Sequence, residues 1–265
     1  ITDKTILVSI IHGNNETGTI QDLETLGNVC KKHGVYFHTD ACQAAGALSL
    51  DVQELGVDAM TLNGSKIYGP KGVGILYLKR GVRIQPLIFG GGQERGLRGG
   101  TENVAYIVGF AKALEIADGM REEESARLIE LRDRLINGLM KSITKTILNG
   151  HPSKRLPNSA NVSILDIEGE AFTLFLNELG IYASTGSACT SESLDPSHVI
   201  IATGLPYECA HGSMRFTLGR STTEEDVDYV LSVVPAIVDI LRKMSPLNLD
   251  ESMVREEGKG ELHYI

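Results

Sequence analysis

The sequence predicts an α/β fold with two domains, and three observations support this. Over residues 1–120, short apolar runs alternate with segments of helical spacing, which is the pattern of βαβ units. Over residues 121–265, strand-like and helical segments follow in an order that fits an antiparallel sheet covered by helices. A chain of 265 residues is also long enough to bury a core in each part.

Short apolar runs bounded by turn residues are the predicted strands of the first domain: Ile6–Ile11, Val35–His38, Ala59–Leu62 and Val73–Leu78. Between the first two strands, Asp22–His33 has helical spacing and Gly34 is placed to end that helix. Val52–Leu55 is predicted to form a short helical piece that Gly56 closes. Asn103 is a candidate N-cap for a helical segment that extends to about residue 143, with a break near Gly119.

The second domain is predicted to begin with an amphipathic helix over Glu122–Ser142, which carries leucines on one face and charges on the other. Gly169–Leu179 has helical spacing, and Thr222 to Glu225 is a capping box that opens a helix to about Lys243. The tail, residues 245–265, is polar and acidic without a clear period. The predicted strands of this domain are Asn161–Leu165, Ile181–Ala183 and Ser213–Leu218.

Charge and cysteine usage exclude several classes of function. The chain has 34 acidic and 25 basic residues, a net charge of −9, which does not favour binding to nucleic acid or to an anionic membrane. No apolar stretch approaches the roughly 20 residues of a membrane span, and Ile1–Thr5 lacks the features of a signal peptide. The four cysteines form no C-x-x-C pair and no zinc spacing. We therefore expect reduced thiols, a cytoplasmic location and no metal site.

Lys66 is the first candidate for chemistry. It follows the apolar run Ala59–Leu62 and precedes a Gly-Pro turn, and a lysine fixed on a rigid turn suits Schiff-base formation. An isolated lysine is more often a solvated surface residue, so the alternative is a turn lysine without a role. Lys71 is the competing lysine in the same turn. The segment is not a phosphate-binding P-loop, because no Gly-Lys-Ser/Thr follows the glycine spacing.

Cys189 is the second candidate, because its neighbours are small or polar and provide no apolar partners. A loop with so few contacts opens at a low free-energy cost, which suits a nucleophile that must travel. Cys30 and Cys42 have apolar neighbours in the sequence, and we expect them to be inert packing residues. Asp40 follows the strand Val35–His38, where it could also serve as an N-cap.

Three segments together carry a resemblance to a known family. These are Asn63-Gly64-Ser65-Lys66-Ile67-Tyr68-Gly69-Pro70-Lys71-Gly72, His38-Thr39-Asp40-Ala41-Cys42-Gln43 and Thr185-Gly186-Ser187-Ala188-Cys189-Thr190-Ser191. The combination closely resembles the cysteine desulfurases of the NifS/IscS type, pyridoxal-phosphate enzymes of the class V aminotransferase family. The resemblance covers nearly the whole chain, but it corresponds to the C-terminal two-thirds of a family member, so the chain is expected to lack the N-terminal third.

The resemblance implies a role for each candidate on the cofactor side. Lys66 would form the Schiff base, Asp40 would face the ring nitrogen and Gln43 the phenolic oxygen. Asn15 would lie near that oxygen and near the substrate carboxylate. The residues implied at the cofactor phosphate are Asn63 and Ser65, together with Thr101, which would reach the phosphate of the neighbouring subunit.

On the substrate side, Arg215 would grip the α-carboxylate, since its planar fork suits a carboxylate, although an ion-paired surface arginine is the alternative. Cys189 would accept sulfur as a persulfide. His12 and His211 match family positions near the site, with no chemical step assigned to either. Thr101 could instead be an N-cap hydroxyl.

The implied fold is the aminotransferase-like fold type I, with part of a mixed seven-stranded sheet in residues 1–120 and a smaller α+β domain in residues 121–265. The implied activity converts L-cysteine to L-alanine and delivers sulfur to an iron–sulfur scaffold or a tRNA-thiolation partner, in a homodimer with shared active sites. Selenocysteine lyase, another class V aminotransferase and a non-catalytic remnant are the alternatives. A bound pyridoxal cofactor would colour the protein yellow and so distinguish the enzymes from the remnant.

Overall fold

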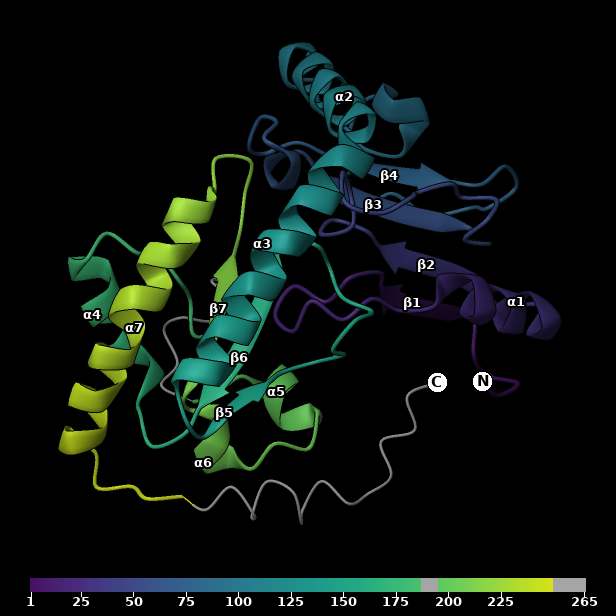
Figure 1. Ribbon diagram of the computed structural model, residues 1–265. Helices are drawn as coiled ribbons and strands as arrows, with labels where there is room; N and C mark the ends of the chain where they lie inside the picture. Colours follow the sequence, from purple (N-terminus) through teal and green to yellow (C-terminus); the bar gives the residue numbers. More distant parts are fainter. Residues whose placement is uncertain (187–194, 250–265) are drawn as a thin grey trace. The chain divides into compact units, whose positions relative to one another are not determined.

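The protein folds as two compact units in the computed structural model, which describes residues 1–186 and 195–249 (Figure 1). The first unit comprises Ile1–Gly13 and Gln21–Glu122, and the second comprises Asn14–Ile20 and the described residues from Glu123 onward. The loop Asn14–Ile20 therefore belongs to the second unit, although the chain on either side of it belongs to the first. No helix in the described ranges is long and apolar enough to cross a membrane.

The first unit is built on a four-stranded mixed sheet, which confirms the predicted α/β class. The strands lie in the order β1, β2, β3, β4, as Figure 1 shows. The first three strands run parallel and β4 runs antiparallel to β3. Their bounds are Leu7–Ile11 for β1, Tyr36–Asp40 for β2, Ala59–Asn63 for β3 and Gly74–Leu78 for β4.

The helices of the first unit begin and end near the residues that the sequence predicts. In α1 (Leu23–His33), Asp22 accepts a hydrogen bond from the backbone of Thr25, and Gly34 ends the helix in the left-handed conformation. In α2 (Val104–Gly119), Asn103 caps the first turn. The main core of this unit joins α1 to the sheet through Leu23, Cys30, Phe37, Ala41, Ala44, Val57 and Met60.

One predicted element of the first unit is wrong. Val52–Leu55 forms a turn instead of a helical piece. The Asp51 carboxylate caps this turn by accepting from the backbones of Gln53 and Glu54, and Leu55 N–H donates to the Asp51 carbonyl, but Gly56 takes a left-handed conformation and ends the turn there. Two short 3₁₀ segments complete this unit, η1 (Gly64–Ile67) and η2 (Gln93–Gly96).

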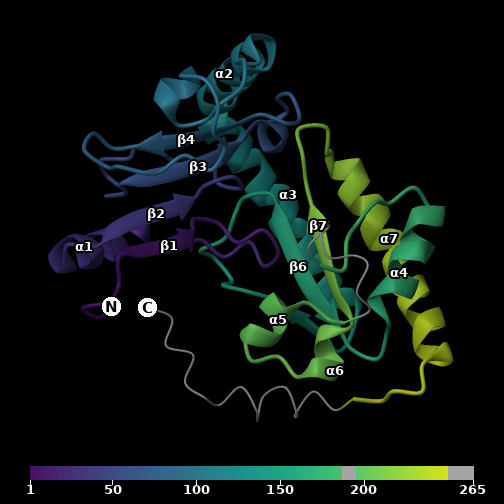
Figure 2. The ribbon, with the colours of Figure 1, turned by 180° about the vertical axis from the view of Figure 1, so that it is seen from behind.

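The second unit contains a three-stranded antiparallel sheet, as predicted, in the order β5 (Thr146–Leu148), β6 (Ser159–Ile164), β7 (Ser213–Thr217). Alternate residues of β6 face the core that three helices form: α3 (Arg121–Ser142), α4 (Gly169–Glu178) and α7 (Glu224–Met244). The helix α3 lies over one face of this sheet, in front of it in Figure 1 and behind it in the reversed view of Figure 2. Ser159, Asn161 and Ser163 lie on the other face of β6, which is therefore polar although it is buried.

Several details of the second unit differ from the prediction. The sequence does not predict β5 or the short helices α5 (His198–Ala202) and α6 (Tyr207–Ala210). Residues 181–183 form no strand, and Ser184 alone pairs with Arg215 in an isolated bridge. The capping box of α7 uses Thr223 and Asp226, one residue later than predicted.

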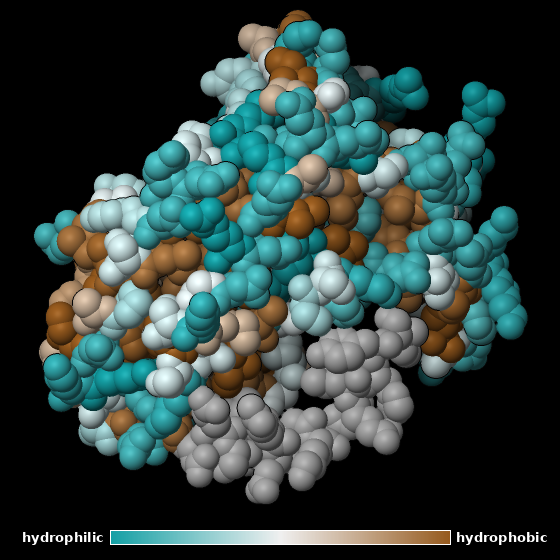
Figure 3. Space-filling model, in the orientation of Figure 1, coloured by the Kyte–Doolittle hydropathy of each residue, from teal (hydrophilic) through white to brown (hydrophobic). Residues whose placement is uncertain are grey.

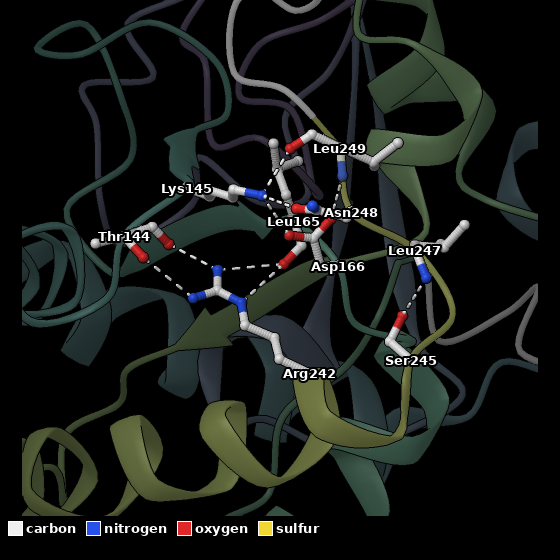
Figure 4. A network of polar contacts seen from close by, with 9 residues as sticks. All are labelled: Thr144, Lys145, Leu165, Asp166, Arg242, Ser245, Leu247, Asn248 and Leu249. Atoms are coloured by element: carbon white, nitrogen blue, oxygen red, sulfur yellow. Dashed lines mark hydrogen bonds and ion pairs between the residues drawn. The ribbon is translucent and has the colours of Figure 1, made fainter.

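The segment that follows α7 is tied to two turns of the second unit by a polar network (Figure 4). Lys145 Nζ donates to Asp166 Oδ2, Asn248 Oδ1 and the Leu249 carbonyl, at 2.7–2.9 Å. Asp166 Oδ1 accepts from the Leu249 backbone N–H. Arg242, near the end of α7, donates to the backbone carbonyls of residues 144 and 165. Part of the predicted polar tail, residues 245–249, is therefore anchored to the unit, and residues 250–265 lie outside the described range.

Candidate functional site

The carboxyl ends of three parallel strands bring most of the predicted cofactor residues of the first unit to one sheet edge. Ile11 of β1 is in register with Asp40 of β2, and Asp40 is in register with Thr61 of β3. Residues that follow these strands, including His12, Gln43 and Lys66, therefore start from the same edge. Ligands of open α/β sheets bind outside the carboxyl ends of the strands, so this edge is the first place to look for a site.

Asp40 is the last residue of β2 and is fixed at both its backbone and its side chain. Its carbonyl accepts a hydrogen bond from the His12 backbone at 2.9 Å. Its Oδ1 accepts one from the Cys42 backbone, also at 2.9 Å. The carboxylate is half-buried, so it combines a defined orientation with access from the strand end.

Lys66 lies in η1, immediately after β3. Asn63 caps this segment, since its Oδ1 accepts hydrogen bonds from both the backbone and the hydroxyl of Ser65, at 2.9 and 2.7 Å. Ile67, the next residue, is buried against α2 and anchors the segment. Lys66 itself is exposed. The Ser65 hydroxyl would have to turn away from Asn63 to donate to a phosphate.

The charges of Asp40 and Lys66 both act on the Cys42 thiol at this edge. Burial, a hydrogen bond to Asp40 and the Asp40 charge raise the pKa of Cys42 to about 12, while the charge of Lys66 opposes the rise. Asp40, Cys42 and Lys66 are therefore close enough to interact electrostatically. Lys71 is exposed in the same turn and is not among the groups that shift the Cys42 pKa.

His12 follows β1 at this edge and is almost completely buried. Its Nδ1 has no hydrogen-bond partner among the described residues. Burial lowers the pKa of His12, because the charged imidazolium loses its hydration. A buried polar atom without a protein partner is uncommon, and such atoms often occur at sites that receive a ligand.

Gln43 and Thr101 complete the predicted cofactor residues of the first unit. Gln43 is half-buried and lies three residues beyond Asp40, in the segment that follows β2. Thr101 is exposed and directly follows Gly100, whose φ of +110° requires a glycine. The structure thus groups Asp40 and Lys66 electrostatically, while Thr101 belongs to an exposed segment before α2.

The predicted substrate residues come together in the second unit. Arg215 lies on β7, and its Nη1 donates to the backbone carbonyl of Asn15 at 2.7 Å. The half-buried guanidinium is thereby placed beside the loop that carries the Asn15 side chain. On the backbone side, Arg215 exchanges two hydrogen bonds with Ser184, which leads into the segment containing Cys189.

The loop Asn14–Ile20 is held in place by several independent contacts. The Asn14 side chain accepts from the backbones of Glu16 and Thr17. Asn161 Nδ2 donates to the Glu16 carbonyl at 3.0 Å, and the buried Arg155 donates to the Thr17 carbonyl at 2.9 Å. These contacts fix the loop on the polar face of the sheet and so fix the position from which Asn15 projects.

Cys189 lies outside the described residues, but the chain that leads to it is described. Ser213 Oγ donates to the Thr185 carbonyl at 3.0 Å, in addition to the bridge between Ser184 and Arg215. His211 contacts Glu168 across 3.7 Å and packs edge-on against Tyr207. Neither contact gives His211 a chemical role.

The sequence-based interpretation misses two residues of these regions. Cys42 is half-buried beside Asp40 and not packed among apolar side chains, whereas the inertness of its thiol stays a prediction; Cys30 is buried in the core as expected. Glu16 is fully buried, and its carboxylate accepts a hydrogen bond from Ser197. Only the spacing of Cys42 two residues after Asp40 could have indicated its contact, since that spacing is typical of an Asx turn.

The residues of the first unit fit a pyridoxal-phosphate cofactor in their chemistry. Lys66 supplies an exposed amine for the aldehyde, and Asp40 supplies an oriented carboxylate for the ring nitrogen. The unpartnered Nδ1 of His12 is a further polar atom at the same strand ends. The group is thus compatible with the donor set at this edge.

A family model and known proteins match this chain over most of its length. The model described as "Aminotransferase class-V" matches residues 1–230. A cysteine desulfurase named IscS from Methanosarcina thermophila is 56% identical over 251 residues, which cover 95% of this chain and 62% of that protein. The chain therefore spans less than two thirds of the length of this relative.

Solved structures also match most of this chain and less than two thirds of their own length. A NifS-like protein superposes with a TM-score of 0.83 at 39% identity, covering 91% of this chain and 63% of the other. A structure of SspA in complex with cysteine has a TM-score of 0.68 at 37% identity and covers 82% of this chain and 60% of the other. Since the family model covers far more than half of the residues, the chain belongs to the aminotransferase class-V family.

Proposed function

We propose that this member of the aminotransferase class-V family is a pyridoxal-phosphate-dependent cysteine desulfurase. It would convert L-cysteine to L-alanine and hold the sulfur as a persulfide on Cys189. The observation that carries the proposal is the grouping of Lys66 and Asp40 at the carboxyl ends of parallel strands, where both charges act on the Cys42 thiol. The names of the relatives support the choice of substrate.

The first unit would bind the cofactor. Lys66 would hold the aldehyde through its amine and, once displaced by substrate, take the proton from the substrate Cα. Asp40 would keep the ring nitrogen protonated, and Gln43 would donate to the phenolic oxygen. When bound, the cofactor supplies an electron sink for the charge left at Cα. The donors proposed for the phosphate are Asn63, Ser65 and, from a neighbouring subunit, Thr101.

The second unit would bind the substrate and remove its sulfur. Arg215 and Asn15 would hold the α-carboxylate, and a guanidinium already fixed by the Asn15 carbonyl loses little freedom on binding. The Cys189 thiolate would then attack the substrate sulfur, leaving a persulfide on the enzyme and a three-carbon fragment that becomes alanine.

We also propose a homodimer in which Thr101 completes the partner's site. The segment before Thr101 and the start of α2 expose large apolar side chains, with Leu87 94% and Phe89 79% exposed and Val104 64% exposed. Figure 3 shows hydrophobic residues at the surface over α2. An isologous interface would remove this apolar surface from water.

The sulfur would pass to an iron–sulfur scaffold or a tRNA-thiolation partner in the cytoplasm. The free thiols of Cys30, Cys42 and Cys209 agree with a reducing compartment. Measuring kcat/KM for L-cysteine and L-selenocysteine separates the proposed activity from selenocysteine lyase. A much higher kcat/KM for L-selenocysteine than for L-cysteine would show that selenocysteine is the substrate and would refute the proposed one.

The direct test begins with the absorbance of the protein after addition of pyridoxal phosphate. A visible band should develop, and borohydride reduction followed by peptide mapping should place the pyridoxyl group on Lys66. Lys71→Ala is the matched control and should retain the band, whereas Lys66→Ala should lose it. A label on Lys71 with Lys66 unmodified would refute the assignment, and a chain that binds no cofactor would refute the function.

A further inference from the structure

Glu16 follows Asn15 in the loop Asn14–Ile20 and is only 2% exposed. Its carboxylate accepts a hydrogen bond from the Ser197 hydroxyl, and its backbone carbonyl accepts one from Asn161 Nδ2 at 3.0 Å. Burying a carboxylate is costly unless it is hydrogen-bonded, and a hydroxyl that donates to a carboxylate forms one of the stronger hydrogen bonds. The side chain and the backbone of Glu16 therefore bind different parts of the second unit.

Ser197 stands where the chain returns from the segment that contains Cys189. Its hydroxyl oxygen also accepts from the backbones of Val199 and Ile200, at 3.1 and 3.4 Å, and so caps α5. Ile200 is completely buried in a small apolar core of the second unit. One hydroxyl thus links the Glu16 carboxylate to a helix that is packed into a core.

Gly186 stands where the chain enters the same segment. A Cβ placed on Gly186 would lie 3.7 Å from Glu16 Oε2 and 3.7 Å from the Ser197 Cβ, so the Gly186 backbone lies against both side chains. The preceding residue, Thr185, is held through its carbonyl by the Ser213 hydroxyl at 3.0 Å. The two described ends of the segment therefore meet at the Glu16 carboxylate.

We propose that Glu16 is a positioning residue whose carboxylate holds Ser197 beside Gly186. The two ends of the segment that contains Cys189 are thereby fixed next to the loop that carries Asn15. The consequence for catalysis rests on the proposed function, in which Cys189 attacks a substrate that Asn15 helps to hold. Fixing both ends of a tether near the target raises the effective concentration of the group that the tether carries.

The Glu16 side chain should therefore affect sulfur transfer without affecting substrate binding. Asn15 is placed by backbone contacts, since Arg215 Nη1 donates to its carbonyl at 2.7 Å and Asn161 donates to the next carbonyl along the chain. Neither contact uses the Glu16 carboxylate. Shortening that side chain should lower kcat for L-cysteine and leave KM nearly unchanged.

The contact itself is tested by a double-mutant cycle in urea unfolding of the cofactor-free protein, which does not depend on the proposed function. If Glu16→Ala and Ser197→Ala remove the same interaction, the double variant should unfold with an equilibrium constant about tenfold smaller than independent effects would give. Glu178→Ala is the matched control, because Glu178 is exposed at the end of α4 in the same unit. Its effect should be independent of Ser197→Ala. Independent effects of Glu16→Ala and Ser197→Ala would overturn the inference.

Single-turnover formation of the persulfide tests the consequence, with mass spectrometry of the Cys189 peptide after reaction with L-cysteine. Glu16→Ala should slow this step by about tenfold, and Ser197→Ala, which removes the donor, should slow it to a similar extent. Glu16→Gln keeps an oxygen that accepts from Ser197 and should stay within about threefold of the wild-type rate. Equal slowing by Glu16→Gln and Glu16→Ala, no slowing by Glu16→Ala, or a change confined to KM would overturn the positioning role. A wild-type chain that forms no persulfide would refute the proposed function, while the double-mutant cycle would still decide the contact.

Discussion

Replacing Asp166 by asparagine tests whether the network of Figure 4 stabilises the second unit. The Asp166 side chain is only 7% exposed, and its two oxygens accept from different donors. Oδ2 accepts from Lys145 Nζ at 2.8 Å and Oδ1 from the Leu249 backbone at 2.6 Å. The Asp166→Asn side chain has nearly the same shape but only one oxygen, so its NH₂ group must face one of these two donors.

The expected loss follows from the burial of that donor. A buried donor left without an acceptor costs about 1–3 kcal/mol. Lys145 keeps its contacts with Asn248 and Leu249, and its side chain is 27% exposed, so water can replace part of the lost interaction. We therefore expect a loss of about 2 kcal/mol in the free energy of unfolding, which corresponds to a decrease in Tm of about 4–8 °C for a unit of this size.

Differential scanning calorimetry measures the loss, since it can follow the transition of the second unit separately from that of the first. The matched control is Asp228→Asn, which removes a carboxylate from a solvent-exposed pair with Arg134 in the same unit. This control should shift Tm much less, because exposed ion pairs contribute little. Equal shifts in the two variants, or no shift in Asp166→Asn, would refute the reasoning.

The remaining predictions concern chemistry, assembly and pH. Cys189→Ser should bind cofactor normally but form neither alanine nor persulfide, and normal turnover of L-cysteine would show that another group accepts the sulfur. A mixture of the Thr101→Ala and Lys66→Ala variants should regain activity, because each heterodimer would contain one intact site. An activity assay of the mixture checks this, and no recovery would contradict the shared site. Burial lowers the pKa of His12, so protons bind preferentially to the unfolded chain and stability should decrease as pH falls below about 6.5. In urea unfolding, His12→Gln should reduce the slope of the free energy of unfolding against pH by up to about 1.4 kcal/mol per pH unit. An unchanged slope would show that His12 is not the source of the pH dependence.

The elements with strong local signals are the ones that the sequence predicts well. The helix α1 has an N-cap at Asp22 and a terminating Gly34, and both act as the sequence indicates. The strand β5 has only three residues, which is too short for a recognisable period, and α5 and α6 have five and four residues. The capping box was displaced by one residue because Thr222 and Thr223 are both acceptable caps, and the structure selects the second through Asp226.

The candidate site is predicted from the sequence only where a residue's environment is local. Asp40 is the last residue of a strand whose apolar run is recognisable in the sequence, so its place at the strand end can be predicted. The surroundings of Cys42 depend on Thr61, on a strand that pairs with β2 only in the folded protein. Glu16 is likewise buried by contacts with residues more than 100 positions away, such as Asn161 and Ser197. No pattern of neighbouring residues contains that information.

The position of Lys66 is set mainly by backbone packing. A Cβ on Gly64 would lie 2.9 Å from the Pro70 carbonyl oxygen, and one on Gly69 would lie 2.9 Å from the Gly64 carbonyl oxygen and 3.0 Å from the Ala113 side chain. The turn that carries Lys66 is therefore closed against itself and against α2, with no space for a side chain at either glycine. Such a turn can present a flexible lysine from a fixed base. A lysine that must hold a cofactor and then accept a proton needs that combination, since its amine moves between two tasks while its backbone stays in place.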